Sequence, residues 1–219
     1  LAPDSGAVEI GSTVKIGHFS QEGRELDLNQ RVYDFIHDIA DEVKTDQGTF
    51  SANQMMERFL FPGDLQSVPI GRLSGGERRR LYLLSVLMAA PNVLVLDEPA
   101  AGLDPEGRDT ILSQIRDYHE KTGITVLLVS HSMEDIAKYA NRVLVMHRAK
   151  IAMYDTVENV FARAQELLEL GLSVPQVTQI FLKLRQMGLD IPADVYTIPY
   201  AVKTIQKALA AKQGGGANA

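Results

Sequence analysis

Apolar and polar positions alternate in blocks along the central part of the chain. Two runs, residues 92–96 (NVLVL) and 124–129 (ITVLLV), are almost wholly apolar, which is typical of strands buried on both faces of a parallel sheet. Around these runs, apolar residues recur at helical spacing. Buried strands that alternate with helices predict an α/β fold with a mostly parallel sheet.

Capping residues mark where several helices are expected to begin and end. Ser74 is followed three residues later by Glu77, which is the pattern of a capping box. Asp104 precedes Pro105 at the start of another predicted helix, and Gly123 is expected to end that helix. Helices are predicted over about residues 29–41, 51–60, 74–90, 104–122, 132–140, 156–170, 175–187 and 199–211.

Shorter patterns predict the remaining strands and loops. Alternation of apolar and polar residues indicates strands near residues 8–10, 14–19, 142–147 and 150–154. Polar segments at 21–28 and 44–48 are expected to be loops, and 213–219, with three consecutive glycines, a flexible tail.

The composition is that of a globular protein. Of 219 residues, 45% are apolar and 23% charged, and the chain is long enough for a sizeable core. The absence of cysteine excludes disulfides, thiolate metal sites and a cysteine nucleophile. The net charge of −6 arises in residues 1–99, with fifteen acidic and nine basic residues, which argues against a nucleic-acid surface. No transmembrane helix or signal peptide is expected.

The sequence LSGGE at residues 73–77 is the sharpest chemical signal. Free amides and the dipole at a helix start suit a phosphate, and two glycines allow the backbone to approach the anion closely. A capped helix after a glycine turn explains the same residues without a ligand. Arg78, Arg79 and Arg80, which follow, could face anions, but a solvent-exposed helix face is the favoured prediction.

Two carboxylates follow the first apolar run. Asp97 and Glu98 would lie at the carboxyl end of a parallel strand, where such folds place ligands. Asp97 could hold Mg²⁺, and Glu98 could position or deprotonate an attacking water. Two acids at a strand exit are also common without function. His131 follows the second run and could bind a terminal phosphate, although a lone histidine is more often structural.

The order and spacing of these motifs resemble the ATP-binding cassette (ABC) ATPase superfamily over nearly the whole chain. Its Q-loop, signature motif, Walker B motif, D-loop and switch histidine correspond to Gln21, residues 73–77, residues 93–98, residues 101–104 and His131. The resemblance implies a P-loop NTPase-like cassette over residues 1–155, with a helical subdomain at about 22–90. A C-terminal helical extension would follow over residues 156–212, before the tail at 213–219.

The resemblance also implies the role of each residue. Asp97 and Gln21 correspond to metal-contacting residues, Glu98 to the general base, and His131 to the histidine on the γ-phosphate. Gln21 is also counted among the nucleotide-binding positions, with Ser74, Gly75, Gly76 and Glu77 of the signature motif, which closes over the ATP of an opposite cassette, and with Asp104, the D-loop residue at the dimer seam. ATP and Mg²⁺ are therefore the expected ligands.

One motif of the family has no counterpart. The sequence contains no G-x-x-x-x-G-K-[S/T] loop, and residues 1–8 resemble the family segment that follows the Walker A helix. The expectation is a cassette truncated at its N-terminus that binds and hydrolyses ATP poorly by itself, since charge stabilisation dominates phosphoryl transfer.

The two parts of the chain resemble different subfamilies. Residues 1–98 resemble the second cassette of an ABC-F protein, and residues 99–212 resemble the ATP-binding subunit of an energy-coupling factor (ECF) importer. The favoured interpretation is an ECF-type ATPase subunit, cytoplasmic and peripheral on the inner face of the cell membrane. Its partners would be a second cassette, in a homo- or heterodimer formed partly through residues 190–211, and a transmembrane subunit. The alternatives are an ABC-F fragment that acts on the ribosome and a non-catalytic cassette that donates its signature motif to a partner's ATP site.

Overall fold

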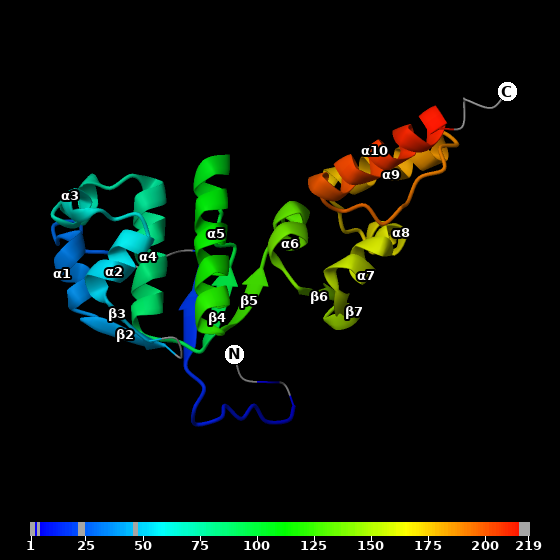
Figure 1. Ribbon diagram of the computed structural model, residues 1–219. Helices are drawn as coiled ribbons and strands as arrows, with labels where there is room; N and C mark the ends of the chain where they lie inside the picture. Colours follow the sequence, from blue (N-terminus) through cyan, green and yellow to red (C-terminus); the bar gives the residue numbers. More distant parts are fainter. Residues whose placement is uncertain (1–2, 4, 22–24, 46–47, 215–219) are drawn as a thin grey trace. The chain divides into compact units, whose positions relative to one another are not determined.

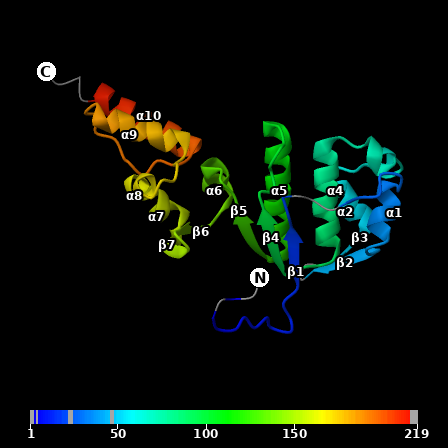
Figure 2. The ribbon, with the colours of Figure 1, turned by 180° about the vertical axis from the view of Figure 1, so that it is seen from behind.

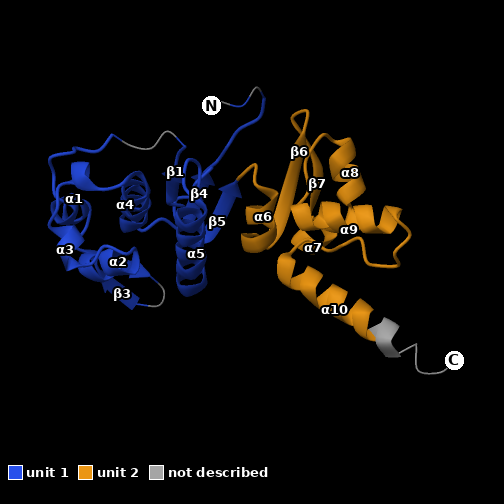
Figure 3. Ribbon diagram, turned by 90° about the horizontal axis from the view of Figure 1, so that it is seen from above, with its two compact units in different colours: residues 1–129 blue, residues 130–219 orange. Residues whose placement is uncertain are grey.

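The computed structural model describes residues 3, 5–21, 25–45 and 48–214 of the chain. It divides into two compact units, residues 1–129 and residues 130–219, which are coloured separately in Figure 3. Within the described residues, no helix has both the length and the apolar character that a membrane span requires. The predicted division into a cassette (1–155) and a helical extension (156–212) stays a prediction.

The first unit is organised by a parallel sheet of three strands in the order β1-β4-β5. These strands are β1 (Ile16–Phe19), β4 (Val93–Asp97) and β5 (Thr125–Val129). In the register, Phe19 lies opposite Leu96, and Asp97 lies opposite Val129, so all three strands end at the same edge. The sheet confirms the predicted parallel α/β fold.

Two long helices lie beside this sheet in both views of the chain (Figures 1 and 2). They are α4 (Gly75–Met88) and α5 (Pro105–Thr122), and both begin and end close to the predicted capping residues. Gly17 allows β1 to approach α4, because a Cβ at Gly17 would lie 2.9 Å from side-chain atoms of Val86 and Pro91. Gly123 ends α5 in the left-handed conformation, with φ of 68°.

The first unit also contains a helical part between β1 and α4. Its elements are α1 (Val32–His37), β2 (Glu42–Thr45), β3 (Gly48–Ser51), α2 (Ala52–Arg58), α3 (Gly63–Gln66) and the 3₁₀ helix η1 (Ile70–Arg72). Ser51 caps α2 through a capping box, which confirms that predicted start. The predicted loop at residues 44–48 is wrong at its ends, because Lys44 and Thr45 belong to β2 and Gly48 belongs to β3, which pairs antiparallel with β2. Residues 46–47 lie outside the described residues.

The helix predicted over residues 29–41 is shorter than expected. It begins at Val32, and its N-cap residue, Arg31, is extended and forms a β-bridge with Pro69. The Val32 amide donates to the Val68 carbonyl at 3.1 Å. Pairing with a segment distant in sequence therefore holds the chain extended where local signals favour a helix.

Two expectations about strands are wrong. Residues 8–10 form no strand, and Val8 and Ile10 are 74% and 63% exposed. In β5, which was expected to be buried, Leu127 and Val129 are about half exposed. Within the described part of the chain, β5 pairs only with β4, so an edge strand replaces the buried strand that the apolar run predicts.

The second unit contains a hairpin and a series of helices. The elements are α6 (Met133–Tyr139), β6 (Arg142–His147), β7 (Lys150–Thr156), α7 (Val157–Ala162), α8 (Ala164–Glu169), α9 (Gln176–Gln186) and α10 (Ile198–Gly214). They confirm the predicted pattern, except that the helix expected over 156–170 is interrupted at Arg163. Gln213 and Gly214 belong to α10 instead of the predicted tail, and residues 215–219 lie outside the described residues.

Candidate functional site

The carboxyl ends of β1 and β4 bring together residues that lie far apart in the sequence. Gln21 follows the end of β1 by two residues, whereas Asp97 ends β4 and Glu98 follows it. Because the two strands are parallel neighbours in register, Gln21 and the two acids leave the sheet at the same edge. This edge is where open parallel sheets bind ligands.

The backbone turns sharply at Glu98. Its φ is +46°, which is uncommon for a residue with a Cβ and is found mainly where the surroundings enforce it. The Glu98 amide donates to the Val129 carbonyl at 3.0 Å, and the Ala101 amide donates to the Glu98 carbonyl at 3.0 Å. The turn therefore directs the chain away from the sheet directly after the acid pair.

One residue predicted to lie on the solvent-exposed face of α4 lies at this edge instead. The guanidinium of Arg79 is partly buried, and its Nη1 donates to the Gln21 carbonyl at 2.9 Å. Its Nη2 donates to the Glu98 carbonyl at 3.1 Å. Burial lowers the pKa of Arg79, while the nearby Tyr82 and Asp97 oppose that shift.

The prediction of a solvated face is also wrong for the neighbours of Arg79. Arg78 and Arg80 are both partly buried, and Arg78 donates to the Leu73 carbonyl at 2.9 Å. A signal for Arg79 was present in the sequence. It precedes the apolar residues Tyr82 and Leu83 by three and four positions, so all three lie on one helical face.

The start of α4 is held by reciprocal hydrogen bonds. The Glu77 amide donates to the Ser74 hydroxyl at 3.2 Å, and the Ser74 amide donates to the Glu77 carboxylate at 2.7 Å. The latter bond holds the pKa of Glu77 below its ordinary value. This geometry confirms the capping box and shows that the Glu77 carboxylate is engaged in it.

Packing does not require glycine at either of the two glycine positions of this motif. A Cβ at Gly75 would meet no atom of the chain within 4 Å, and a Cβ at Gly76 would make an ordinary contact of 3.7 Å with Leu103. Neither glycine has positive φ. Packing within the described residues therefore does not explain why position 75 lacks a side chain.

The other two motif residues lie at helix starts. Asp104 is the N-cap of α5, and its carboxylate accepts from the Gly107 amide at 3.1 Å. His131 is exposed and immediately precedes Ser132, the N-cap of α6. His131 belongs to the second unit, whereas the other motif residues belong to the first. Its expected role at the γ-phosphate stays a prediction.

The acid pair offers few protein ligands to a metal. Among the described residues, no group of three or more His, Cys, Asp or Glu side chains could hold a metal ion. Asp97 with Gln21 nevertheless fits Mg²⁺, because this ion usually binds one or two carboxylates and takes its other ligands from water and substrate phosphates. The donor set suits an ion that arrives with a nucleotide.

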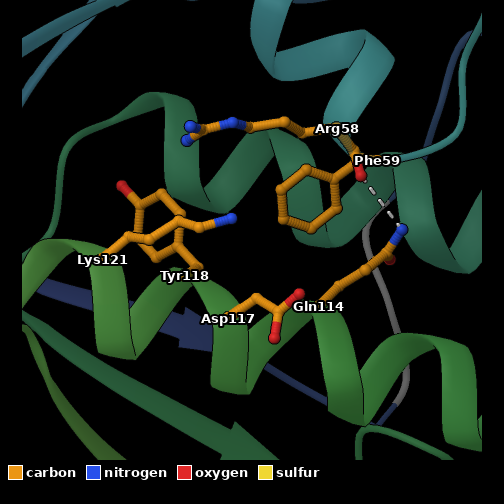
Figure 4. A pocket seen from close by; sticks show the side chains of 6 residues that line it. All are labelled: Arg58, Phe59, Gln114, Asp117, Tyr118 and Lys121. Carbon is orange, nitrogen blue, oxygen red and sulfur yellow. Dashed lines mark hydrogen bonds between the residues drawn. The ribbon is translucent and has the colours of Figure 1, made fainter.

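A small pocket lies elsewhere in the first unit, between the end of α2 and α5 (Figure 4). Its volume is about 70 Å³, and the Gln114 amide beside it donates to the Arg58 carbonyl at 3.4 Å. Burial raises the pKa of Tyr118, and Arg58 opposes that shift. The lining residues are Arg58, Phe59, Gln114, Asp117, Tyr118 and Lys121, and none of the predicted motif residues is among them. The volume is too small for a nucleotide.

Comparison with known sequences identifies a matching family and relatives that cover more than half of the chain. Residues 12–135, more than half of the chain, match the family described as "AAA domain, putative AbiEii toxin, Type IV TA system". The energy-coupling factor transporter ATP-binding protein EcfA2 of Symbiobacterium thermophilum is 51% identical over 155 residues, which are 71% of this chain and 53% of that protein. EcfA2 of Caldanaerobacter subterraneus is 46% identical over 137 residues, which are 63% of this chain and 48% of that protein.

A solved structure shares the fold. CbiO1 from Clostridium perfringens, part of the ABC transporter complex CbiONQ, has a TM-score of 0.56 and 24% identity over 80% of this chain and 66% of that chain. The present chain spans about half the length of the curated relatives it matches. The predicted resemblance of residues 1–98 to an ABC-F cassette stays a prediction.

Proposed function

We propose that this chain serves as the ATP-binding subunit of an ECF transporter. It belongs to the AAA domain family, as an ABC ATPase domain, and it is homologous to such subunits. It would couple hydrolysis of ATP to transport by a transmembrane partner. ATP hydrolysis would take place at the cytoplasmic face of the cell membrane. The residues described at the candidate site do not point to the toxin activity that the family's description names.

The observation that carries the proposal is the common edge reached by β1 and β4. Asp97 and Glu98 leave one strand where Gln21 leaves its neighbour, and Arg79 joins both segments. A metal ligand, a base and a polar residue for the attacking water need to lie within a few ångströms of one another. The parallel register brings their backbones to one place although Gln21 and Asp97 lie 76 positions apart in the sequence.

Each residue has a proposed task in phosphoryl transfer. Asp97 and Gln21 would hold Mg²⁺, which neutralises charge on the phosphates when bound. Glu98 would orient the attacking water and accept its proton, so that the negative charge of the carboxylate is exchanged for that of the nucleophile. His131 would donate a hydrogen bond to the γ-phosphate. In phosphoryl transfer, charge stabilisation of this kind is usually the largest single contribution to the rate.

The signature residues favour a second, narrower candidate, in which the chain donates them to the ATP of an opposite cassette. Gly75 leaves open space at the start of α4, where free amides and the helix dipole suit an anion. Asp104 would lie at the seam between the two cassettes. This arrangement needs no phosphate-binding loop from the donating chain.

The second unit offers a surface for pairing with another cassette. Helix α10 carries exposed apolar side chains at positions 198, 202, 205 and 209, which is the spacing of one helical face. These residues are Ile198, Val202, Ile205 and Leu209, with exposed fractions of 73%, 48%, 45% and 56%. Burial of this stripe against a second copy or a related cassette would stabilise the pair.

The test measures binding and turnover of Mg-ATP. A fluorescent ATP analogue is titrated into the 219-residue chain, with competition by unlabelled ATP, and weak binding by the chain alone is expected. Turnover is then measured for the chain mixed with the S. thermophilum EcfA2 protein. We expect turnover above the sum of the separate proteins.

Variants of the chain separate the roles. For this chain's own site, Glu98→Gln should lower the excess turnover by about a hundredfold or more, as loss of a general base does. For the matched control, the exposed Asp64 of α3 is changed to Asn, which should leave turnover unchanged. If Glu98→Gln leaves the excess turnover unchanged, only the second candidate holds, in which the chain donates its signature residues to the ATP of the opposite cassette. No excess turnover at all would overturn both candidates.

A further inference from the structure

Arg79 places a guanidinium among four backbone carbonyls. In addition to Gln21 and Glu98, it donates to the carbonyls of Ser20 at 3.2 Å and Pro99 at 3.3 Å. Its charge is thus shared between the chain that leaves β1 and the chain that leaves β4. Since the bonds go to backbone oxygens, they constrain the path of these segments and not a particular side-chain rotamer.

The guanidinium of Arg79 packs against the aromatic ring of Phe19, which belongs to β1. The Arg79 guanidinium carbon lies 4.3 Å from the centroid of the Phe19 ring, and Phe19 stacks on Tyr82 with centroids 4.7 Å apart. Phe19 is fully buried, and Tyr82 belongs to α4 one turn after Arg79. The contact with Phe19 and the hydrogen bonds to the carbonyl oxygens therefore hold the planar guanidinium of Arg79 in one orientation.

One of the four carbonyls belongs to the strained residue of the site. Glu98 has positive φ, and its carbonyl accepts both from Arg79 and from the Ala101 amide. A left-handed residue with a Cβ persists only where its surroundings determine the conformation. Two charge-assisted bonds, to Glu98 and to Pro99 directly after it, are suited to that task.

We infer that Arg79 is a positioning residue that ties helix α4 to the backbone at Gln21 and Glu98. Arg79 lies four residues after Gly75, so the helix that begins with the signature residues carries the tie within its second turn. A displacement of α4 would be transmitted directly to both segments of the strand edge. The functional meaning of this tie rests on the proposed function, whereas its geometry does not.

A role in packing alone does not account for this arrangement. Removing a guanidinium from water is costly, and burial lowers the pKa of Arg79 accordingly. An apolar side chain could cover the Phe19 ring without that cost. The cost of burying the charge is offset mainly by hydrogen bonds to four carbonyl oxygens, all of which lie at the candidate site.

The experiment measures amide hydrogen exchange in the 219-residue chain without nucleotide. Arg79→Gln should raise the exchange rates of the Glu98 and Ala101 amides by about tenfold or more, as expected when bonds from a charged donor are lost. The Leu84 amide, in the middle of α4, should change by less than about threefold. In the matched control, Arg116, whose ion pair with Glu120 is exposed, is changed to Gln and should change none of these rates.

Two further variants keep the inference falsifiable. Arg79→Lys keeps the charge but not the planar fork, so the Ala101 amide should exchange at a rate between those of the wild type and Arg79→Gln. If Arg79→Gln does not fold, Arg79→Lys decides alone, and its Ala101 amide should exchange faster than in the wild type while its Leu84 amide should not. In a Glu98→Gly background, where positive φ costs little, Arg79→Gln should raise the Ala101 rate by less than about threefold.

The outcomes separate this inference from the proposed function. Equal acceleration at Leu84 and Ala101, or no acceleration at Ala101, would overturn the tie. The same acceleration in the Glu98→Gly background would show that Arg79 does not hold the Glu98 conformation. Because no nucleotide is used, the absence of excess turnover would refute the proposed function and leave the exchange results standing.

Discussion

A negative charge introduced at Gly75 should separate stability of the fold from binding of phosphate. A Cβ at this position meets no atom within 4 Å, and Gly75 is the first residue of α4. Gly75→Asp should therefore leave the stability unchanged or raise it. Replacing glycine in a helix contributes up to about 1 kcal/mol, and an acid in the first turn adds about 0.3–1 kcal/mol.

The same change should oppose a phosphate. Two unit charges about 5 Å apart repel by about 3 kcal/mol at an effective dielectric constant of about 20. This repulsion corresponds to roughly a hundredfold loss of affinity, because each 1.4 kcal/mol is a factor of about ten. Gly75→Asp should thus maintain or raise the free energy of unfolding but lower the affinity for nucleotide. A loss of structure would lower both.

The assay compares this variant with Gly63→Asp. Gly63 is likewise the first residue of a helix, α3, and its Cβ would also meet no atom within 4 Å. Urea unfolding and excess Mg-ATP turnover with S. thermophilum EcfA2 are measured for both variants. We expect turnover to fall only for Gly75→Asp. Equal turnover in the two variants, with both folded, would refute a phosphate at the start of α4.

Three further predictions concern stability and its dependence on pH. Phe181→Ala, at a site only 1% exposed, should lower the free energy of unfolding by about 3–5 kcal/mol, whereas Ile180→Ala, at a site 57% exposed, should change it by less than about 0.5 kcal/mol in urea unfolding. Glu77→Gln should be less stable than the wild type above pH 4.5, the ordinary pKa of Glu77, and the difference should vanish as pH falls and the lowered pKa is passed, which acid titration of stability would reveal. Burial, with Glu158 as hydrogen-bond partner, raises the pKa of Tyr196 from 10 to about 12, so stability should fall between these pH values in the wild type and less in Tyr196→Phe. An identical alkaline decline in both proteins would contradict that assignment.

The proposed function and the inferred tie lead to one view of the first unit. Helix α4 begins at the residues that would meet a phosphate and, one turn later, holds the backbone beside the acid pair. A nucleotide that draws the helix start toward itself would therefore also act on Glu98. If so, the positive φ at Glu98 would be part of how the site responds to its ligand.

Local signals in the sequence were sufficient for most elements. The capping boxes at Ser51 and Ser74 and the Asp104 cap act over three residues, and each helix begins where its cap predicts. The parallel sheet followed from apolar runs that alternate with helices. The resemblance named the motif residues at the ends of β1 and β4, and the parallel direction of the two strands brings their backbones to one edge.

Tertiary structure decided what depends on contacts between distant segments. Arg31 is extended instead of helical because it bridges to Pro69, and β5 lies at the edge of the sheet because, among the described residues, it pairs with β4 alone. The arginine run after the signature looks like a charged helix face until β1 and β4 present their carbonyls to Arg79, one of them 58 positions away in the sequence. Periodicity and caps report interactions over a few residues, whereas burial of a charge depends on which backbone groups the fold places around it.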